Sequence, residues 1–138
     1  MILTKKRVLG KFETLDIIEF FARMWLGYIL ITNSRIGVTV PLESLGMGPE
    51  MLGIFQSLWK TNFLMHSAKL VELLGGICLV LNFKVPLALL AIVPVVFNIY
   101  GLHIFLFGNP VGKGLAMFLI CIFLVFRHRE IFLPILKN

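Results

Sequence analysis

Ionisable side chains lie inside two apolar stretches of this chain, at spacings that place each set on one face of a helix. They are Asp16, Glu19 and Arg23 in the first stretch, and His66, Lys69 and Glu72 in the second. An ionisable group at membrane depth costs at least about 2.5–3.5 kcal/mol, so it normally faces a partner or a cavity. Carboxylates, histidines and lysines in such places can form ion pairs, exchange protons or bind the polar head of a ligand.

Helix geometry places two of these groups at matching depths. Counted at about 1.5 Å per residue from the helix ends near Leu15 and Asn82, Arg23 lies about 12 Å deep and Glu72 about 15 Å deep. We therefore expect Arg23 and Glu72 to pair directly, because each charge would relieve the desolvation of the other.

A third apolar stretch adds polar residues toward the outer side. Asn98 falls about 21 Å deep, level with Lys69 at about 20 Å, and His103 lies farther out together with His66. We predict one line of ligand-binding or proton-path residues, formed by Glu19, Arg23, His66, Lys69, Glu72, Asn98 and His103. Such a line has two interpretations, which are interhelical contacts that fix helix register, or a proton path or polar ligand pocket.

The composition indicates which elements hold these residues. The chain has 138 residues, of which 59% are hydrophobic and 14% charged, whereas soluble domains have about 45–50% and about 25%. The sequence predicts an all-α fold, a transmembrane four-helix bundle that forms a single membrane domain over residues 1–138. Its spans, each long enough to cross a bilayer, are expected at about residues 15–32, 62–81, 85–107 and 111–126.

The positions of the basic residues predict the orientation and argue against a nucleic-acid partner. Of the 13 Lys and Arg residues, two lie inside spans, eight fall on the side of both termini and three on the other side. Because cytoplasmic segments carry the excess of Lys and Arg, we expect both termini in the cytoplasm of a bacterial inner membrane. The flanking cations would contact membrane lipids. The charged first span lacks a small-residue cleavage site, so we expect it to be retained.

The connection between the first two spans is much longer than the others. It contains Pro41, Gly46 and Pro49, followed by apolar residues at helical spacing. This pattern predicts a short interfacial helix at about residues 49–60 in the first extracytoplasmic connection. The helix would be either a structured cap over the bundle or a lid over a pocket that opens to the lipid.

Several motifs resemble those of the DoxX/DoxD family of small four-helix integral membrane proteins. Residues 22–30 (ARMWLGYIL) are similar to its opening helix pattern R-x-x-x-G-x-x-F, with a different ending. Residues 69–79 (KLVELLGGICL) resemble its second helix, in which glycines and leucines follow a glutamate. Residues 94–103 (PVVFNIYGLH) resemble its third helix, which often carries a histidine near the outer end.

The resemblance implies a function as well as a four-helix bundle. Family members are associated with a thiosulfate:quinone oxidoreductase and with redox or thiol-stress complexes. Arg23, Glu72 and His103 match the family's polar pattern. We therefore expect a subunit or partner of a quinone-linked redox complex that is not catalytic alone, with other membrane-protein subunits as partners and a quinone as the candidate cofactor.

The expected ligand site lies beside Lys69, Glu72 and Asn98. Its apolar walls would be formed by Leu26, Leu30, Leu73 and Phe97. No histidine spacing indicates a metal site. Two other classes of function stay open, namely a non-catalytic structural subunit or assembly factor, and a carrier of small molecules or protons.

Overall fold

The computed structural model describes residues 14–61, 63–105, 108 and 110–137. The helices in chain order are α1 (Thr14–Ser34), the 3₁₀-helix η1 (Leu42–Leu45), α2 (Pro49–Lys60), α3 (Phe63–Val80), α4 (Val85–Phe105), α5 (Lys113–Arg127) and α6 (Arg129–Leu136). Among these residues, strand-like pairing is limited to one isolated bridge, between Ile36 and Val40. The prediction of an all-α fold is therefore confirmed.

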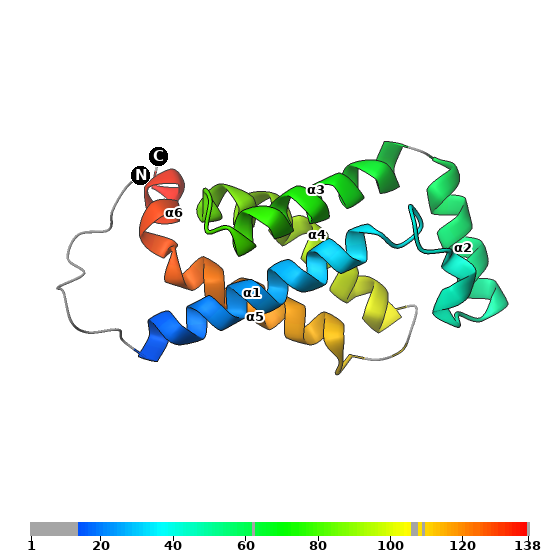
Figure 1. Cartoon of the computed structure of the whole chain (residues 1–138), viewed down its shortest axis with the longest axis horizontal. Coiled ribbons are helices and arrows are strands. Elements are labelled where there is room, and N and C mark those ends of the chain that lie inside the picture. Colours follow the sequence, from blue (N-terminus) through cyan, green and yellow to red (C-terminus); the bar gives the residue numbers. More distant parts are fainter. Residues whose placement is uncertain (1–13, 62, 106–107, 109, 138) are drawn as a thin grey trace.

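The helices α1, α3, α4 and α5 run along the long axis of the molecule, whereas α2 and α6 lie at its ends (Figure 1). The neighbours α1 and α3, α3 and α4, and α4 and α5 pack against each other, whereas α1 and α5 meet more sparsely. The helix α2 crosses one end and contacts α3 and η1. The helix α6 lies at the opposite end, after α5.

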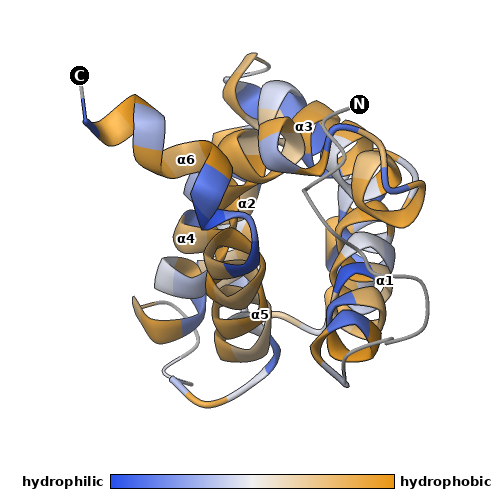
Figure 2. Cartoon of the chain, turned by 90° about the vertical axis from the view of Figure 1, so that its left-hand side faces the viewer, coloured by the Kyte–Doolittle hydropathy of each residue, from blue (hydrophilic) through white to orange (hydrophobic). Residues whose placement is uncertain are grey.

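Two of the helices, α3 and α4, are long and apolar enough to cross a membrane. Only 22% of the apolar window of α3 and 28% of that of α4 is buried inside the structure, whereas a core helix of a soluble protein is mostly buried. Figure 2 shows these helices coloured largely as hydrophobic. The coarse expectation of membrane-compatible helices therefore holds for this pair.

The other two expected spans, α1 and α5, are not both long and apolar enough by the same measure, each for a different reason. The helix α1 carries Asp16, Glu19 and Arg23 along its first half. The helix α5 has 15 residues, or about 22 Å, which is less than the roughly 30 Å of a hydrocarbon core. It begins at Lys113 rather than at Val111, because Gly112 is still extended. A membrane crossing by α1 and α5 is therefore a proposal, made below.

The core lies where the four long helices meet. Its fully buried side chains are Leu26, Leu30, Leu79, Leu89, Ile92, Val96, Met117 and Leu124. The helices α1 and α3 come closest at two glycines, since a β-carbon on Gly27 would lie only 2.9 Å from the carbonyl oxygen of Gly76. These contacts fix the relative positions of the helices that carry the polar residues.

The helix α6 was not expected from the sequence. The basic residues after residue 126 mark the end of an apolar run, but they do not prevent the backbone from remaining helical. After one non-helical residue, His128, the chain continues as α6 with no fully buried side chain. Its Phe132 packs against the edge of the core.

Candidate functional site

The seven predicted site residues do not form one line, and the first of them belongs to an ion cluster between α1 and α5. Arg127 Nε lies 3.1 Å from Glu19 Oε2, and Arg127 Nη2 lies 2.9 Å from Asp16 Oδ1. His128 Nε2 is 3.7 Å from Glu19 Oε1. These partly buried side chains connect the start of α1 to the end of α5. Two acids on one helix face require a cation at the same depth, and Arg127 meets that requirement.

The predicted ion pair between Arg23 and Glu72 was wrong. The Arg23 side chain is buried, and its Nη1 donates a hydrogen bond to Oδ1 of Asn82, in the turn after α3. The Arg23 Nε has no hydrogen-bond partner in the described part of the chain. Depth counted along a helix describes the α-carbon positions, whereas a long arginine side chain places its charge up to a helical turn away.

Glu72 pairs within its own helix instead. The Lys69 Nζ lies 3.2 Å from Glu72 Oε1 and 3.1 Å from Oε2, three residues along α3. The Glu72 side chain is only 3% exposed, so this nearly dry carboxylate needs the adjacent ammonium. Lys69 lies three residues before Glu72 on the same helix, so the two side chains can pair without any particular alignment of α1 and α3. This explains why Glu72 pairs with Lys69 rather than with the more distant Arg23.

Asn33 joins this pair to two other helices. The backbone carbonyl of Asn33 accepts a hydrogen bond of 3.0 Å from Lys69 Nζ, and its Oδ1 accepts one of 3.3 Å from Lys113 Nζ. We call Asn33, Lys69, Glu72 and Lys113 the Asn33 cluster. It connects the end of α1, the middle of α3 and the start of α5. Because Lys113 is exposed, hydrogen bonds and ion pairs lead from the surface to the buried carboxylate.

The sequence did not single out Asn33 or Lys113, although both carry a usable signal. Asn33 directly follows the first predicted span and Lys113 is the third residue of the last one, so both fall on the predicted outer side together with Lys69. At about 1.5 Å per residue, Lys113 lies about 20 Å from residue 126, level with Lys69. Asn33 lies about 27 Å from Leu15, about one helical turn farther out.

The remaining predicted residues lie apart from the Asn33 cluster. The ring of His66 packs edge-on against Trp59 of α2, with ring centroids 5.0 Å apart. The ring of His103 packs against Gly114 of α5, and its Nδ1 lies 2.8 Å from the carbonyl oxygen of Ile99. Asn98 is exposed on the outer face of α4.

The residues expected to wall a shared ligand pocket do not share one space. Leu26 and Leu30 are completely buried, whereas the side chains of Leu73 and Phe97 are 36% and 62% exposed on the outside. The surface is hollowed elsewhere. One hollow of about 520 Å³ is an apolar groove between α1 and α5, which is lined by residues such as Phe21, Trp25 and Phe123.

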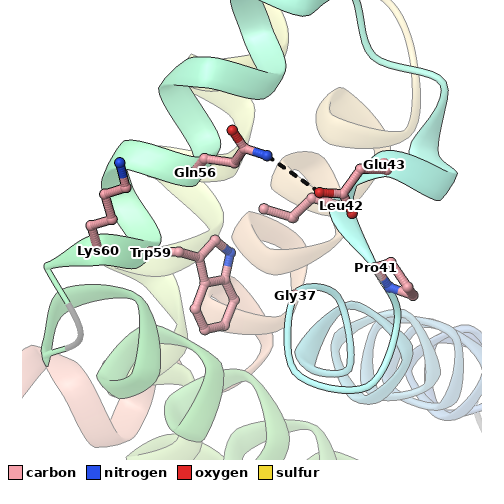
Figure 3. A pocket seen from close by; sticks show the side chains of 7 residues that line it. All are labelled: Gly37, Pro41, Leu42, Glu43, Gln56, Trp59 and Lys60. Atoms are coloured by element: carbon pink, nitrogen blue, oxygen red, sulfur yellow. Dashed lines mark hydrogen bonds between the residues drawn. The ribbon is translucent and has the colours of Figure 1, made fainter.

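A second hollow, of about 550 Å³, lies between α2 and the preceding connection. It is lined by Gly37, Pro41, Leu42, Glu43, Gln56, Trp59 and Lys60, and we call it the cap pocket (Figure 3). Neither hollow is lined by Lys69, Glu72 or Asn98.

The chemistry offered by these groups is ion pairing, hydrogen bonding and proton exchange. Within the described residues, no three His, Cys, Asp or Glu side chains are grouped so that they could hold a metal ion. Cys78 and Cys121 are both free thiols. No family model, no curated protein and no solved structure matches this chain.

Proposed function

We propose that the chain is an integral membrane protein of four spans, formed by α1, α3, α4 and α5, with both termini on the cytoplasmic side of a bacterial inner membrane. The Lys and Arg distribution supports this orientation. The contacts of α1 support its insertion, because Asp16 and Glu19 share the guanidinium of Arg127. Glu19 also lies near His128. The short helix α5 requires a locally thinned bilayer, at a modest cost per ångström.

Within the membrane, we propose a non-catalytic subunit of a larger assembly, of the quinone-linked redox kind that the DoxX resemblance implies. Asn98 carries this proposal. It is exposed about two-thirds of the way along α4 and forms no hydrogen bond with any described residue. The outer face of α4 also carries apolar side chains, and Leu87, Leu90 and Phe97 are each about three-fifths exposed.

An amide in this position needs a partner. Facing lipid, its donors and acceptor would stay unsatisfied, which is costly in hydrocarbon. Asparagine side chains commonly form hydrogen bonds between membrane helices, at about 0.6–2 kcal/mol each. A helix of another subunit, seated on this face of α4, would supply the missing hydrogen bonds and cover the apolar side chains.

A second candidate function, a buried proton or quinone-binding site, is favoured by the Asn33 cluster. Glu72 is almost fully buried, yet Lys69, Asn33 and the exposed Lys113 link it to the surface. The cluster offers the Glu72 carboxylate as a proton acceptor and the ammonium groups of Lys69 and Lys113 as hydrogen-bond donors to the head group of a lipid-soluble ligand. The site would then belong to the same subunit and serve the assembly.

Mild-detergent extraction from native membranes, followed by mass spectrometry of proteins and lipids, tests both proposals. We expect the wild type to retain one or more membrane-protein partners and Asn98→Leu to lose them. Gln56→Leu is the matched control, because it removes an exposed amide from α2, outside the spans, and should leave the partners in place. Retention of the same partners by Asn98→Leu would contradict the subunit proposal.

The same preparations examine the Asn33 cluster. The double variant Lys69→Leu/Glu72→Gln removes the pair without leaving one buried charge alone. We expect it to lose any bound quinone while keeping the protein partners of the wild type. A wild type that carries partners but no quinone would exclude ligand binding at this cluster and leave a structural role.

A further inference from the structure

The cap pocket is a hollow that is open to the surface and lined by apolar, polar and charged side chains. Its volume of about 550 Å³ falls within the range of ligand pockets, roughly 300–1,000 Å³. Leu42 and Pro41 from the connection, together with the Trp59 indole, supply apolar surface. Glu43 and Lys60 supply one charge of each sign. The sequence predicts a cap or a lid in this region and does not predict a polar ligand there.

Trp59 supplies a hydrogen-bond donor that has no acceptor. Its Nε1 is buried and unpartnered in the described part of the chain. A buried donor without a partner costs about 1–3 kcal/mol, so such groups usually mark a place for an acceptor. The indole is held in place by Gly37, where any β-carbon would lie 2.2 Å from the ring, and by the ring of His66. Figure 3 shows the Leu42 side chain between the indole and Glu43. The Nε1 edge of the indole faces Gly37, where a β-carbon would lie 2.5 Å from that nitrogen.

The two charges of the cap pocket lie at opposite ends and do not neutralise each other. Glu43 Oε1 accepts a hydrogen bond of 3.3 Å from Gln56 Nε2. Lys60 lies on the far side of Gln56 in Figure 3 and forms no ion pair with any residue that the structure describes. The lining therefore has no net charge but presents a carboxylate at one end and a free ammonium at the other.

We propose that the cap pocket binds a zwitterion in which an ammonium and a phosphate are separated by a short linker, as in a phosphatidylethanolamine head group. The ligand ammonium donates to Glu43 at one end. The phosphate accepts from Lys60 and, once the backbone at Gly37 moves aside, from the Trp59 Nε1. This arrangement gives a partner to Lys60 and Trp59 and a charged partner to Glu43, three polar groups that line the cap pocket.

The charge pattern favours a zwitterion over a singly charged ligand. An anion would satisfy Lys60 and Trp59 but would bring its charge near Glu43, and a cation would have the reverse conflict at Lys60. The same chemistry could come from a lipid or from free phosphoethanolamine. The α2 helix adjoins the apolar helix α3, and tryptophans and short amphipathic helices gather at membrane surfaces, which favours the lipid.

Fluorescence of Trp59 in the full chain, purified in detergent, tests this proposal. The chain has two tryptophans, so Trp25→Phe leaves Trp59 as the reporter. We expect a saturable change in its emission with short-chain phosphatidylethanolamine and a much weaker one with phosphatidylglycerol. Glu43→Gln and Lys60→Gln should each weaken the apparent affinity by about fivefold to tenfold.

Two control variants and one soluble probe complete the experiment. Glu50→Gln removes an exposed α2 carboxylate that does not line the pocket and should leave the affinity unchanged, and Lys60→Arg should retain most of it. Binding of free phosphoethanolamine as tightly as the lipid would keep the zwitterion but assign a soluble source. No saturable change with either probe, or equal binding of phosphatidylglycerol, would overturn the proposal. If a variant loses its helical circular dichroism signal, the test uses the Trp25→Phe protein alone. Displacement of the lipid by free phosphoethanolamine would then support the zwitterion site, and no displacement would overturn it.

Discussion

Arg23 and Glu72 each place a charge inside the bundle, and each is stabilised by a different neighbour. Both side chains are buried in an apolar bundle, where an unpaired charge is costly. Glu72 has Lys69 on its own helix, and Arg23 has the amide oxygen of Asn82. An arginine next to a neutral acceptor is only partly compensated, and its Nε remains without a partner among the described residues. Asn82 is therefore the residue on which the burial of Arg23 depends.

Replacing Asn82 separates its backbone role from its side-chain role. Asn82 has φ +54, a conformation that glycine adopts without strain, so Asn82→Gly removes only the acceptor for Arg23. We expect a loss of about 1.5–3 kcal/mol in the free energy of unfolding. Asn82→Asp should be at least as stable as the wild type, because it gives Arg23 a charged partner.

Denaturant unfolding in micelles, followed by circular dichroism, measures both changes. Lys84→Gly is the matched control, since Lys84 has φ +43 in the same turn and the hydrogen bond of Arg23 goes to Asn82 instead. If Asn82→Gly and Lys84→Gly unfold alike, the hydrogen bond to Arg23 carries no stability.

The types of the site residues could be predicted from the sequence, but their pairing could not. Charged residues that interrupt apolar runs are easy to find in the sequence, and these include Glu19, Arg23, Lys69 and Glu72. Which of them pair depends on side-chain length and rotation, and α-carbon depth does not give these. Asn98 shows the same limit, because its depth matched that of Lys69 while its direction around α4 placed it outside the bundle.

At the scale of helices, α1 is held differently on its two sides. Toward α3, two glycines allow the backbones to touch. Toward α5, the ion cluster around Arg127 closes one end and an apolar groove runs along the contact. Apolar runs predicted the long helices well, because hydrophobic length is a property of the local sequence. They did not predict the start of α5 or the presence of α6, because backbone conformation at Gly112 and His128 decides these ends.

Substitution of Gly27 tests the close contact between α1 and α3. A β-carbon in Gly27→Ala would meet Val80 Cγ2 at 2.7 Å as well as the Gly76 carbonyl, so the helices must move apart. We expect the free energy of unfolding to fall by about 1–3 kcal/mol. The matched control is Gly101→Ala in α4, where a β-carbon meets open space. It should be neutral or stabilising by up to about 1 kcal/mol. Equal effects of the two substitutions would show that α1 and α3 do not need this approach.

For the whole molecule, the deciding question is how many helices cross the membrane. If α1, α3, α4 and α5 all cross, the connection that contains η1 lies on the opposite side from α6. If only α3 and α4 cross, the chain enters and returns once, so η1 and α6 lie on the same side. The two arrangements therefore differ in whether η1 and α6 lie on the same side of the membrane or on opposite sides.

Cysteine labelling in intact cells distinguishes these arrangements. In a background with Cys78→Ala and Cys121→Ala, Ser44→Cys in η1 and Lys137→Cys after α6 each supply one accessible thiol. With four spans and cytoplasmic termini, we expect a membrane-impermeant maleimide to label Ser44→Cys in intact cells and Lys137→Cys only after lysis. The eight-to-three distribution of Lys and Arg predicts this direction. Labelling of both sites in intact cells, or of both only after lysis, would leave α1 and α5 outside the bilayer core and exclude the four-span arrangement.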